Sequence, residues 1–288
     1  RAKEYGSWET AYFVTIARTF GMGVNGDLME QWATSIPMQV IEHHSDDLFQ
    51  LEALFIGQAG LLELETIPSQ YQHDALNEGY FAKLRNEYLY IAHKYSLSPL
   101  DGMQWKPMGK GCNRNPHSAF SFLANMVYQR KTSLQTMLAC ETAKEVTSLL
   151  EVSATPYWQI RSHFGAECKT CAKRLSVERL NLIVINAVVP MLFAYGRCKG
   201  NEVYCDRAFD IIEQCRSEKN AVTKHWAQYG IKAETAGDSQ ALIQLQREYC
   251  DKRQCLRCRF GYEFLRGRTK IEGYRNMAIE PDMFAELY

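Results

Sequence analysis

The sequence predicts a mainly α-helical protein, an irregular multi-helix domain whose C-terminal, cysteine-rich segment is a candidate for a metal staple. Three observations lead to this fold class. Apolar residues recur at steps of three and four along most of the 288 residues, which is the spacing of one face of a helix. Residues that favour helix starts precede these runs, and glycine or proline follows them. No stretch alternates polar and apolar residues for long enough to predict a sheet.

Helix signals are clearest in the N-terminal part of the chain. Ser7 is expected to cap a helix that continues to Phe20, because a serine oxygen accepts a hydrogen bond from a free N–H of the first turn. Residues 45–47 are expected to open another helix. The run 70–95 carries the longest amphipathic pattern and predicts a long helix.

Further along, Thr142 with Glu145 forms a capping-box pair that predicts a helix start. The polar stretch 162–174 is expected to be a loop. The apolar stretch 176–195 predicts a central core helix, broken or kinked near Pro190, since proline cannot donate the helix hydrogen bond.

These signals divide the chain into four expected parts. Residues 1–100 form an N-terminal helical part, and 101–116 form a loop or linker with the turn-forming composition of a connection. Residues 117–270 form a second helical part that ends in the cysteine cluster, and 271–288 are expected to be a tail.

Composition places the chain among ordinary globular proteins, with 46% hydrophobic and 23% charged residues. Lysine plus arginine and aspartate plus glutamate both number 33, so any attraction to nucleic acid has to be local. The longest apolar stretch, 182–195, falls short of the roughly 20 residues that cross a bilayer, so no membrane span is expected. No leader follows Arg1, and a cytoplasmic location with reduced cysteines is expected.

Cys250, Cys255 and Cys258 have the spacing C-x4-C-x2-C. The two-residue gap lets neighbouring thiolates reach one tetrahedral ion. Zinc and an iron–sulfur cluster both accept four thiolates, so either is a candidate. Cys205 is the fourth ligand that we assign, with Cys198, His225 and a residue outside this chain as alternatives.

Two other interpretations of the cysteines stay open. The three thiols can be reduced and hold no metal. Alternatively, Cys168 and Cys171 form a second C-x2-C pair that could share one zinc with Cys255 and Cys258, leaving Cys250 out.

The segment around these cysteines has a local excess of positive charge. Between Arg247 and Lys270, eight basic residues face three acidic ones, a net charge of +5. Aromatic residues are interleaved with them, so cations could meet phosphates while rings stack on bases. The alternative is a solvated basic face with the rings in a small core. The candidate nucleic-acid contacts are Lys252, Arg253, Arg257, Arg259 and Arg266.

Glu9, Glu52 and Glu87 lie within predicted amphipathic helices, and Glu52, which Leu51 and Ala53 flank, is a candidate for burial. Burial would raise its pKa, which a general acid needs. A surface position, or a buried partner such as Arg18 or Lys94, is the ordinary explanation. No catalytic residue is assigned in this chain.

Several motifs together resemble one bacterial family, known as domain of unknown function 2851. The resemblance implies that this chain is the C-terminal two-thirds of a longer member, whose β-rich N-terminal region is similar to metal-dependent nucleases. That missing region is then an expected partner. The motifs that carry the resemblance are Trp8-Glu9-Thr10, Phe20-Gly21, 48–54 with 57–60, Tyr157-Trp158, Ile185-Asn186, Val189-Pro190, 193–196, 238–242 and Tyr249-Cys250-Asp251 with Cys255 and Cys258.

Three hypotheses about function follow. The first is a helical accessory module of a nucleic-acid-associated protein, stapled by a cysteine-bound metal or cluster. The second is a protein-interaction scaffold without metal. The third is part of a nuclease-like enzyme whose catalytic residues lie in the missing N-terminal region.

Overall fold

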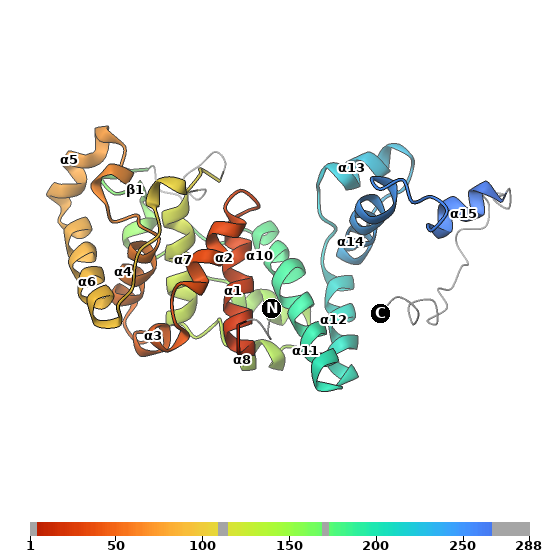
Figure 1. The fold of residues 1–288 in the computed structure, drawn as a ribbon, viewed down its shortest axis with the longest axis horizontal. Coiled ribbons are helices and arrows are strands. Elements are labelled where there is room, and N and C mark those ends of the chain that lie inside the picture. The colour runs from red at the N-terminus through yellow and green to blue at the C-terminus, as the bar shows by residue number, and fades with distance from the viewer. Residues whose placement is uncertain (1–4, 109–114, 169–172, 267–288) are drawn as a thin grey trace. The chain divides into compact units, whose positions relative to one another are not determined.

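The computed structural model describes residues 5–108, 115–168 and 173–266, and it is mainly helical, as predicted (Figure 1). The chain divides into two compact units. Unit 1 comprises Arg1–Arg216 with Thr235–Gly237, and unit 2 comprises Ser217–Glu234 with Asp238–Tyr288. This division falls well beyond the expected linker at 101–116. The expected tail at 271–288 lies outside the described residues.

Unit 1 is built from short and medium helices with one small hairpin. Its elements are α1 (Trp8–Phe20), α2 (Gly26–Thr34), α3 (Met38–His43), α4 (Leu48–Gln58), η1 (Leu64–Thr66), α5 (Ser69–Glu78), α6 (Tyr80–Tyr95), η2 (Gly102–Gln104), α7 (Pro116–Tyr128), α8 (Leu134–Ala139), α9 (Ala143–Leu150), η3 (Tyr157–Gln159), β1 (Arg161–His163), β2 (Ala166–Glu167), α10 (Val177–Ile183), η4 (Val184–Val188), α11 (Val189–Lys199) and α12 (Glu202–Gln214).

Three predicted helix starts are confirmed by side-chain caps. The Ser7 hydroxyl accepts a hydrogen bond from the backbone N–H of Thr10 at 3.0 Å, at the start of α1. Asp47 accepts from the N–H groups of the first turn of α4. Thr142 accepts from the N–H of Glu145 at 3.2 Å, at the start of α9. Each cap satisfies an N–H that the helix itself leaves unpaired.

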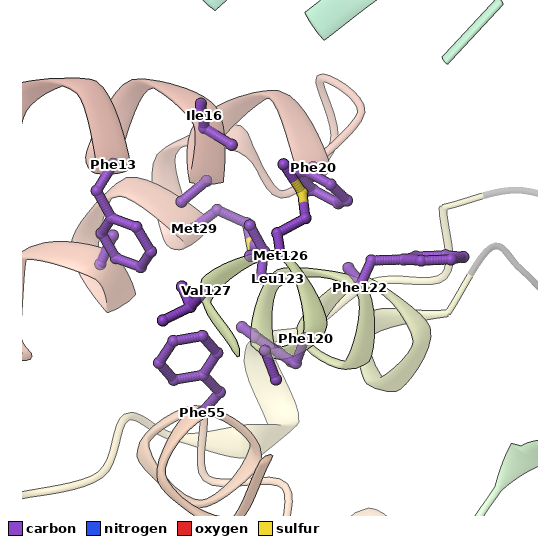
Figure 2. Packing of buried hydrophobic residues seen from close by; sticks show 14 of the residues in the cluster. Phe13, Ile16, Phe20, Met29, Phe55, Phe120, Phe122, Leu123, Met126 and Val127 are labelled. Atoms are coloured by element: carbon purple, nitrogen blue, oxygen red, sulfur yellow. The ribbon is translucent and has the colours of Figure 1, made fainter. Parts of the chain in front are cut away.

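The core of unit 1 forms where α1, α2, α4 and α7 meet. Trp32 is fully buried, and its ring centroid lies 5.0 Å from that of Phe55 and 4.8 Å from that of Phe120. The indole N–H of Trp32 donates to the carbonyl oxygen of Phe55 at 3.0 Å. Figure 2 shows Phe13, Phe55 and Val127 pointing toward one another in this core. Burial of these large rings is the main stabilising contribution here.

The predicted long helix over 70–95 is wrong as a single element. Gly79 adopts φ +70°, in the left-handed region, and separates α5 from α6. Glycine reaches this conformation without the clash that a Cβ causes. After the break, α6 packs closely on α4, so that a Cβ added at Gly57 would lie 2.1 Å from the ring of Tyr88.

The described part of the expected linker is packed rather than free. The indole N–H of Trp105 donates to the carbonyl oxygen of Ala59 at 2.7 Å. The N–H of Leu100 donates to the carbonyl oxygen of Gln58 at 2.9 Å. Residues 100–105 therefore seal the C-terminal end of α4, while 109–114 lie outside the described residues.

The stretch 162–174, expected to be a loop, contributes to a small antiparallel hairpin instead. Arg161 pairs with Glu167 and His163 pairs with Ala166 across β1 and β2. Gly165 turns the chain with φ +73°. The strands are too short to show a period-2 pattern, which explains why they could not be recognised from the sequence.

The predicted core helix is longer than expected, because α10, η4 and α11 follow one another without interruption from Val177 to Lys199. The segment η4 is π-helical and directly precedes α11, where the missing N–H of Pro190 disturbs the hydrogen-bond ladder. Among the described residues this is the one stretch long and apolar enough to cross a membrane, by length and composition alone. Half of its apolar window is buried inside the protein, and the core helices of soluble proteins meet the same criteria.

Unit 2 contains α13 (Ala221–Gln228), most of α14 (Ala236–Gln244), the π-helical segment η5 (Leu245–Cys250) and α15 (Arg259–Leu265). Asn220 and Thr223 form a capping box at the start of α13. Within the described part of unit 2, only Ser239 and Cys258 are buried. The described part of unit 2 therefore has almost no apolar core of its own.

The close contact between α4 and α6 gives a first testable prediction. Gly57→Ala is expected to lower the free energy of unfolding by about 1–3 kcal/mol, because the new methyl group overlaps the buried ring of Tyr88. Gly26→Ala is the matched control, since a Cβ there meets only ordinary contacts at 3.8 Å. Urea unfolding of both variants provides the measurement. Equal stability of the two variants would contradict the packing described here.

Candidate functional site

The predicted site begins where η5 ends. Cys250 closes η5, Cys255 lies in the following turns, and Cys258 precedes the first residue of α15. The N–H of Cys258 donates to the carbonyl oxygen of Gln254 at 3.1 Å, which holds the turn that contains both thiols. Arg253 adopts φ +53° in this connection. Cys250 and Cys255 are exposed, whereas Cys258 is buried.

The three thiols influence one another electrostatically. Burial raises the pKa of the Cys250 thiol, and the neighbouring Cys258 and Cys255 raise it further. The described residues nevertheless contain no group of three or more His, Cys, Asp or Glu side chains already arranged to hold a metal ion. The predicted metal centre therefore stays a prediction for Cys250, Cys255 and Cys258.

Cys205, the predicted fourth ligand, lies in unit 1 on α12 and is buried. Its thiol is 3.7 Å from the carbonyl oxygen of Phe193, and a Cβ added at Gly196 would lie 2.9 Å from its sulfur. For the alternative pair, Cys168 is half-buried and Cys171 lies outside the described residues.

The predicted nucleic-acid contacts, Lys252, Arg253, Arg257, Arg259 and Arg266, are all exposed. Two of these cations have partners within unit 2. Lys252 forms an ion pair with Glu248, and the guanidinium of Arg266 lies 4.7 Å from the ring centroid of Tyr262. In the part of the chain that the structure describes, no carboxylate lies within ion-pairing distance of the other three arginines. Their charges therefore face solvent without compensation from these residues.

The aromatic residues of α15 are exposed as well. Phe264 is 72% exposed, Phe260 54% and Tyr262 39%. In the part of the chain that the structure describes, Phe260, Tyr262 and Phe264 therefore do not fill a small core, whereas Tyr249 is half-buried. Cations and rings share one solvent-facing segment, 252–266, which we call the basic–aromatic segment.

A second polar cluster lies inside unit 1 and centres on Glu52. The hydroxyl of Tyr80 donates to its carboxylate at 2.6 Å, and the hydroxyl of Thr155 donates at 2.8 Å. Burial raises the pKa of Glu52 to about 7, although both hydrogen bonds act in the opposite direction. The prediction that Arg18 is the buried partner of Glu52 is wrong, because Arg18 pairs with Asp27 and Glu30 of α2 instead.

His117 is a fully buried titratable group near this cluster. Its ring stacks on Trp158 at a centroid distance of 4.9 Å and lies 5.7 Å from the ring of His163. Neither ring nitrogen has a hydrogen-bond partner among the described residues. Burial lowers the pKa of His117 to about 3, so the imidazole stays neutral. Nothing in the sequence indicated this burial, because His117 follows Pro116 at a helix start, where exposed residues are common.

Glu52 has a pKa that would suit a general acid, but the residue is only 2% exposed. A cleft of about 1040 Å³ opens in unit 1 and is lined by Trp8, Arg18, Arg179, Leu182, Asn186 and Met191 among others. Neither Glu52 nor His117 lines it. Because a general acid has to reach the reacting atom, the buried cluster is best explained by its role in packing.

The raised pKa of Glu52 predicts a pH-dependent stability. The folded protein holds this proton more tightly than the unfolded chain, whose carboxyl pKa is about 4.5. Ionisation of Glu52 therefore lowers the free energy of unfolding. This loss of stability is absent below pH 4.5, grows up to about pH 7 and then stays constant. Glu52→Gln removes it, so the variant should gain about 3 kcal/mol relative to the native chain between these limits. Urea unfolding across this pH range tests this, and parallel pH curves for the two proteins would refute it.

His117 predicts a loss of stability in acid. Its folded pKa of about 3 lies below the ordinary value of 6.5, so the unfolded chain takes up the proton first as the pH falls. Stability is then lost progressively below about pH 6.5. The phenylalanine of His117→Phe cannot be protonated in the unfolded chain. The Tm of this variant should therefore fall less than that of the native chain between pH 8 and pH 5.

Thermal unfolding at both pH values is the measurement for His117, with His73→Phe as the control, because His73 is exposed. The control should lose as much stability in acid as the native chain does. An identical pH response in all three proteins would show that His117 is not buried in its neutral form.

Comparison with known proteins gives one match. Residues 2–221 match the family described as "Protein of unknown function (DUF2851)". The match ends before the basic–aromatic segment and its cysteines. Neither the curated proteins nor the solved structures contain a match. Since the matched region is more than half of the chain, the protein belongs to the DUF2851 family.

Proposed function

We propose that this chain is a helical module that associates with nucleic acid through unit 2. The observation that carries the proposal is the group of three exposed arginines without an ion-pair partner among the described residues, Arg253, Arg257 and Arg259. The chain as a whole is neutral, so this concentration of charge is a local feature. Cations of this kind replace the counterions bound to phosphates, and the release of these ions makes the association favourable and dependent on salt.

We also propose that Cys250, Cys255 and Cys258 hold a structural zinc ion or iron–sulfur cluster. The small core of unit 2 supports this proposal, since only Ser239 and Cys258 are buried in its described part. Small units without a sufficient core are usually stabilised by a metal, a disulfide or a partner. Thiolates bind these metals, so binding would draw the proton from Cys250 despite its raised pKa. Cys205, or a donor outside this chain, would complete the set.

The scaffold hypothesis receives less support. An exposed patch of tryptophans would favour it, but Trp32 is fully buried. Trp105 and Trp226 are both half-buried, and the indole N–H of Trp105 donates to the carbonyl oxygen of Ala59. A role as partner for an N-terminal region, which the family resemblance implies, stays a prediction.

Charge neutralisation tests nucleic-acid binding. The triple variant Arg253→Gln, Arg257→Gln, Arg259→Gln is expected to bind a labelled oligonucleotide at least about tenfold more weakly and to reduce the slope of log affinity against log salt by about 2. Fluorescence anisotropy over a salt series is the measurement. The matched control is Lys83→Gln, Lys144→Gln, Arg197→Gln, which removes three exposed charges from unit 1. If both triple variants lose affinity equally, the proposed surface is wrong.

Metal content tests the second proposal. After anaerobic purification, the native chain should contain either zinc or iron with sulfide, and Cys255→Ser with Cys258→Ser should lose it. Cys140→Ser, which changes a half-buried thiol outside every candidate ligand set, is the control. Cys205→Ser asks separately whether the buried thiol is a ligand. A native chain that contains neither metal under these conditions would rule out the staple.

A further inference from the structure

We infer that the basic–aromatic segment selects single-stranded nucleic acid by stacking unpaired bases on Phe260 and Phe264. This inference rests on the proposed nucleic-acid binding and adds the class of substrate. The arginines alone would bind the phosphates of single strands and duplexes alike. The exposed rings beside them supply the discrimination.

Several large apolar side chains of this segment are in contact with water. Within a few residues of the three arginines, Phe264 is 72% exposed, Phe260 54%, Leu256 75% and Leu265 59%. Isolated exposed apolar residues are common on proteins, but several together mark a binding surface.

The two phenylalanine rings are placed on one side of a helix. Phe260 and Phe264 are four residues apart on α15, which puts their Cβ atoms about 5–6 Å apart. An aromatic ring that faces solvent can stack on the face of one unpaired base. Arg259 directly precedes Phe260 at the start of α15, so the same short helix carries a phosphate-binding cation, although adjacent residues of a helix do not point the same way.

The accessibility of a base explains why the rings prefer single strands. Both faces of a paired base are covered by its neighbours in the stack, and an aromatic side chain reaches them only after unstacking. Unpaired bases expose their faces and stack on aromatic side chains without regard to sequence. The two rings therefore add affinity for single strands and add little for a duplex.

The charge on this segment favours nucleic acid over a protein partner. An apolar protein surface that covered Phe264 and Leu265 would lie against a segment whose Arg253, Arg257 and Arg259 have no carboxylate partner among the described residues. Burial of an unpaired charge is costly. A polyanion with flat apolar faces satisfies both the cations and the rings.

The experiment compares the native chain with the double variant Phe260→Leu, Phe264→Leu. Leucine keeps an apolar side chain but has no ring for stacking. Binding to an oligothymidylate and to a hairpin duplex with the same number of phosphates is measured by fluorescence anisotropy. Tyr90→Leu with Tyr128→Leu, two exposed rings of unit 1, is the matched control.

The expected result is that the native chain prefers the single strand, and that the double variant loses about tenfold or more of this affinity. Its duplex affinity and its salt slope should stay unchanged, since no cation is removed. Equal native affinity for both probes, or a double variant that binds the single strand normally, would overturn the inference and leave the phosphate-binding proposal intact. Absence of binding to either probe would instead refute the proposed function itself.

Discussion

Unit 1 depends on a helix that is surrounded by protein over most of its length. Every residue of α4 from Leu51 to Gln58 is buried, so its polar side chains need partners inside the protein. Glu52 finds two hydroxyl groups. The amide of Gln58 accepts from the hydroxyl of Tyr88 at 2.9 Å and donates to the carbonyl oxygen of Ser98 at 2.7 Å. These bonds fix α6 and the segment after it against α4, in addition to the apolar contacts.

Unit 2 has a different physical basis. In unit 1, large apolar side chains are buried in a core. In the described part of unit 2, side chains of the same kind, such as Phe264 and Leu256, are exposed to solvent. A unit of this kind gains stability from a ligand or a partner. The small core of the described part of this unit also leaves its cations and aromatic rings on the surface. The metal staple and the nucleic-acid contacts proposed for this unit therefore both follow from the small number of buried residues in its described part.

The interior of unit 1 also shows that a perturbed pKa does not by itself locate a catalytic site. Glu52 is held by neutral hydroxyl groups and His117 by aromatic rings, and neither lines the cleft of this unit. Titratable groups in a protein interior have shifted pKa values because the charged form is poorly solvated. Function additionally requires access, which the basic–aromatic segment has and this cluster lacks.

The helix starts and the helical fold class could be predicted from the sequence because they depend on local interactions. The caps at Ser7, Asp47 and Thr142 involve neighbours within three residues. Burial depends instead on residues far apart in the chain, so the candidate sites became clear only in the folded protein. The contact of Glu52 with Thr155 spans 103 residues, and no local pattern predicts it. Whether an aromatic residue such as Phe264 lies in a core or faces solvent is likewise settled only when the helices pack.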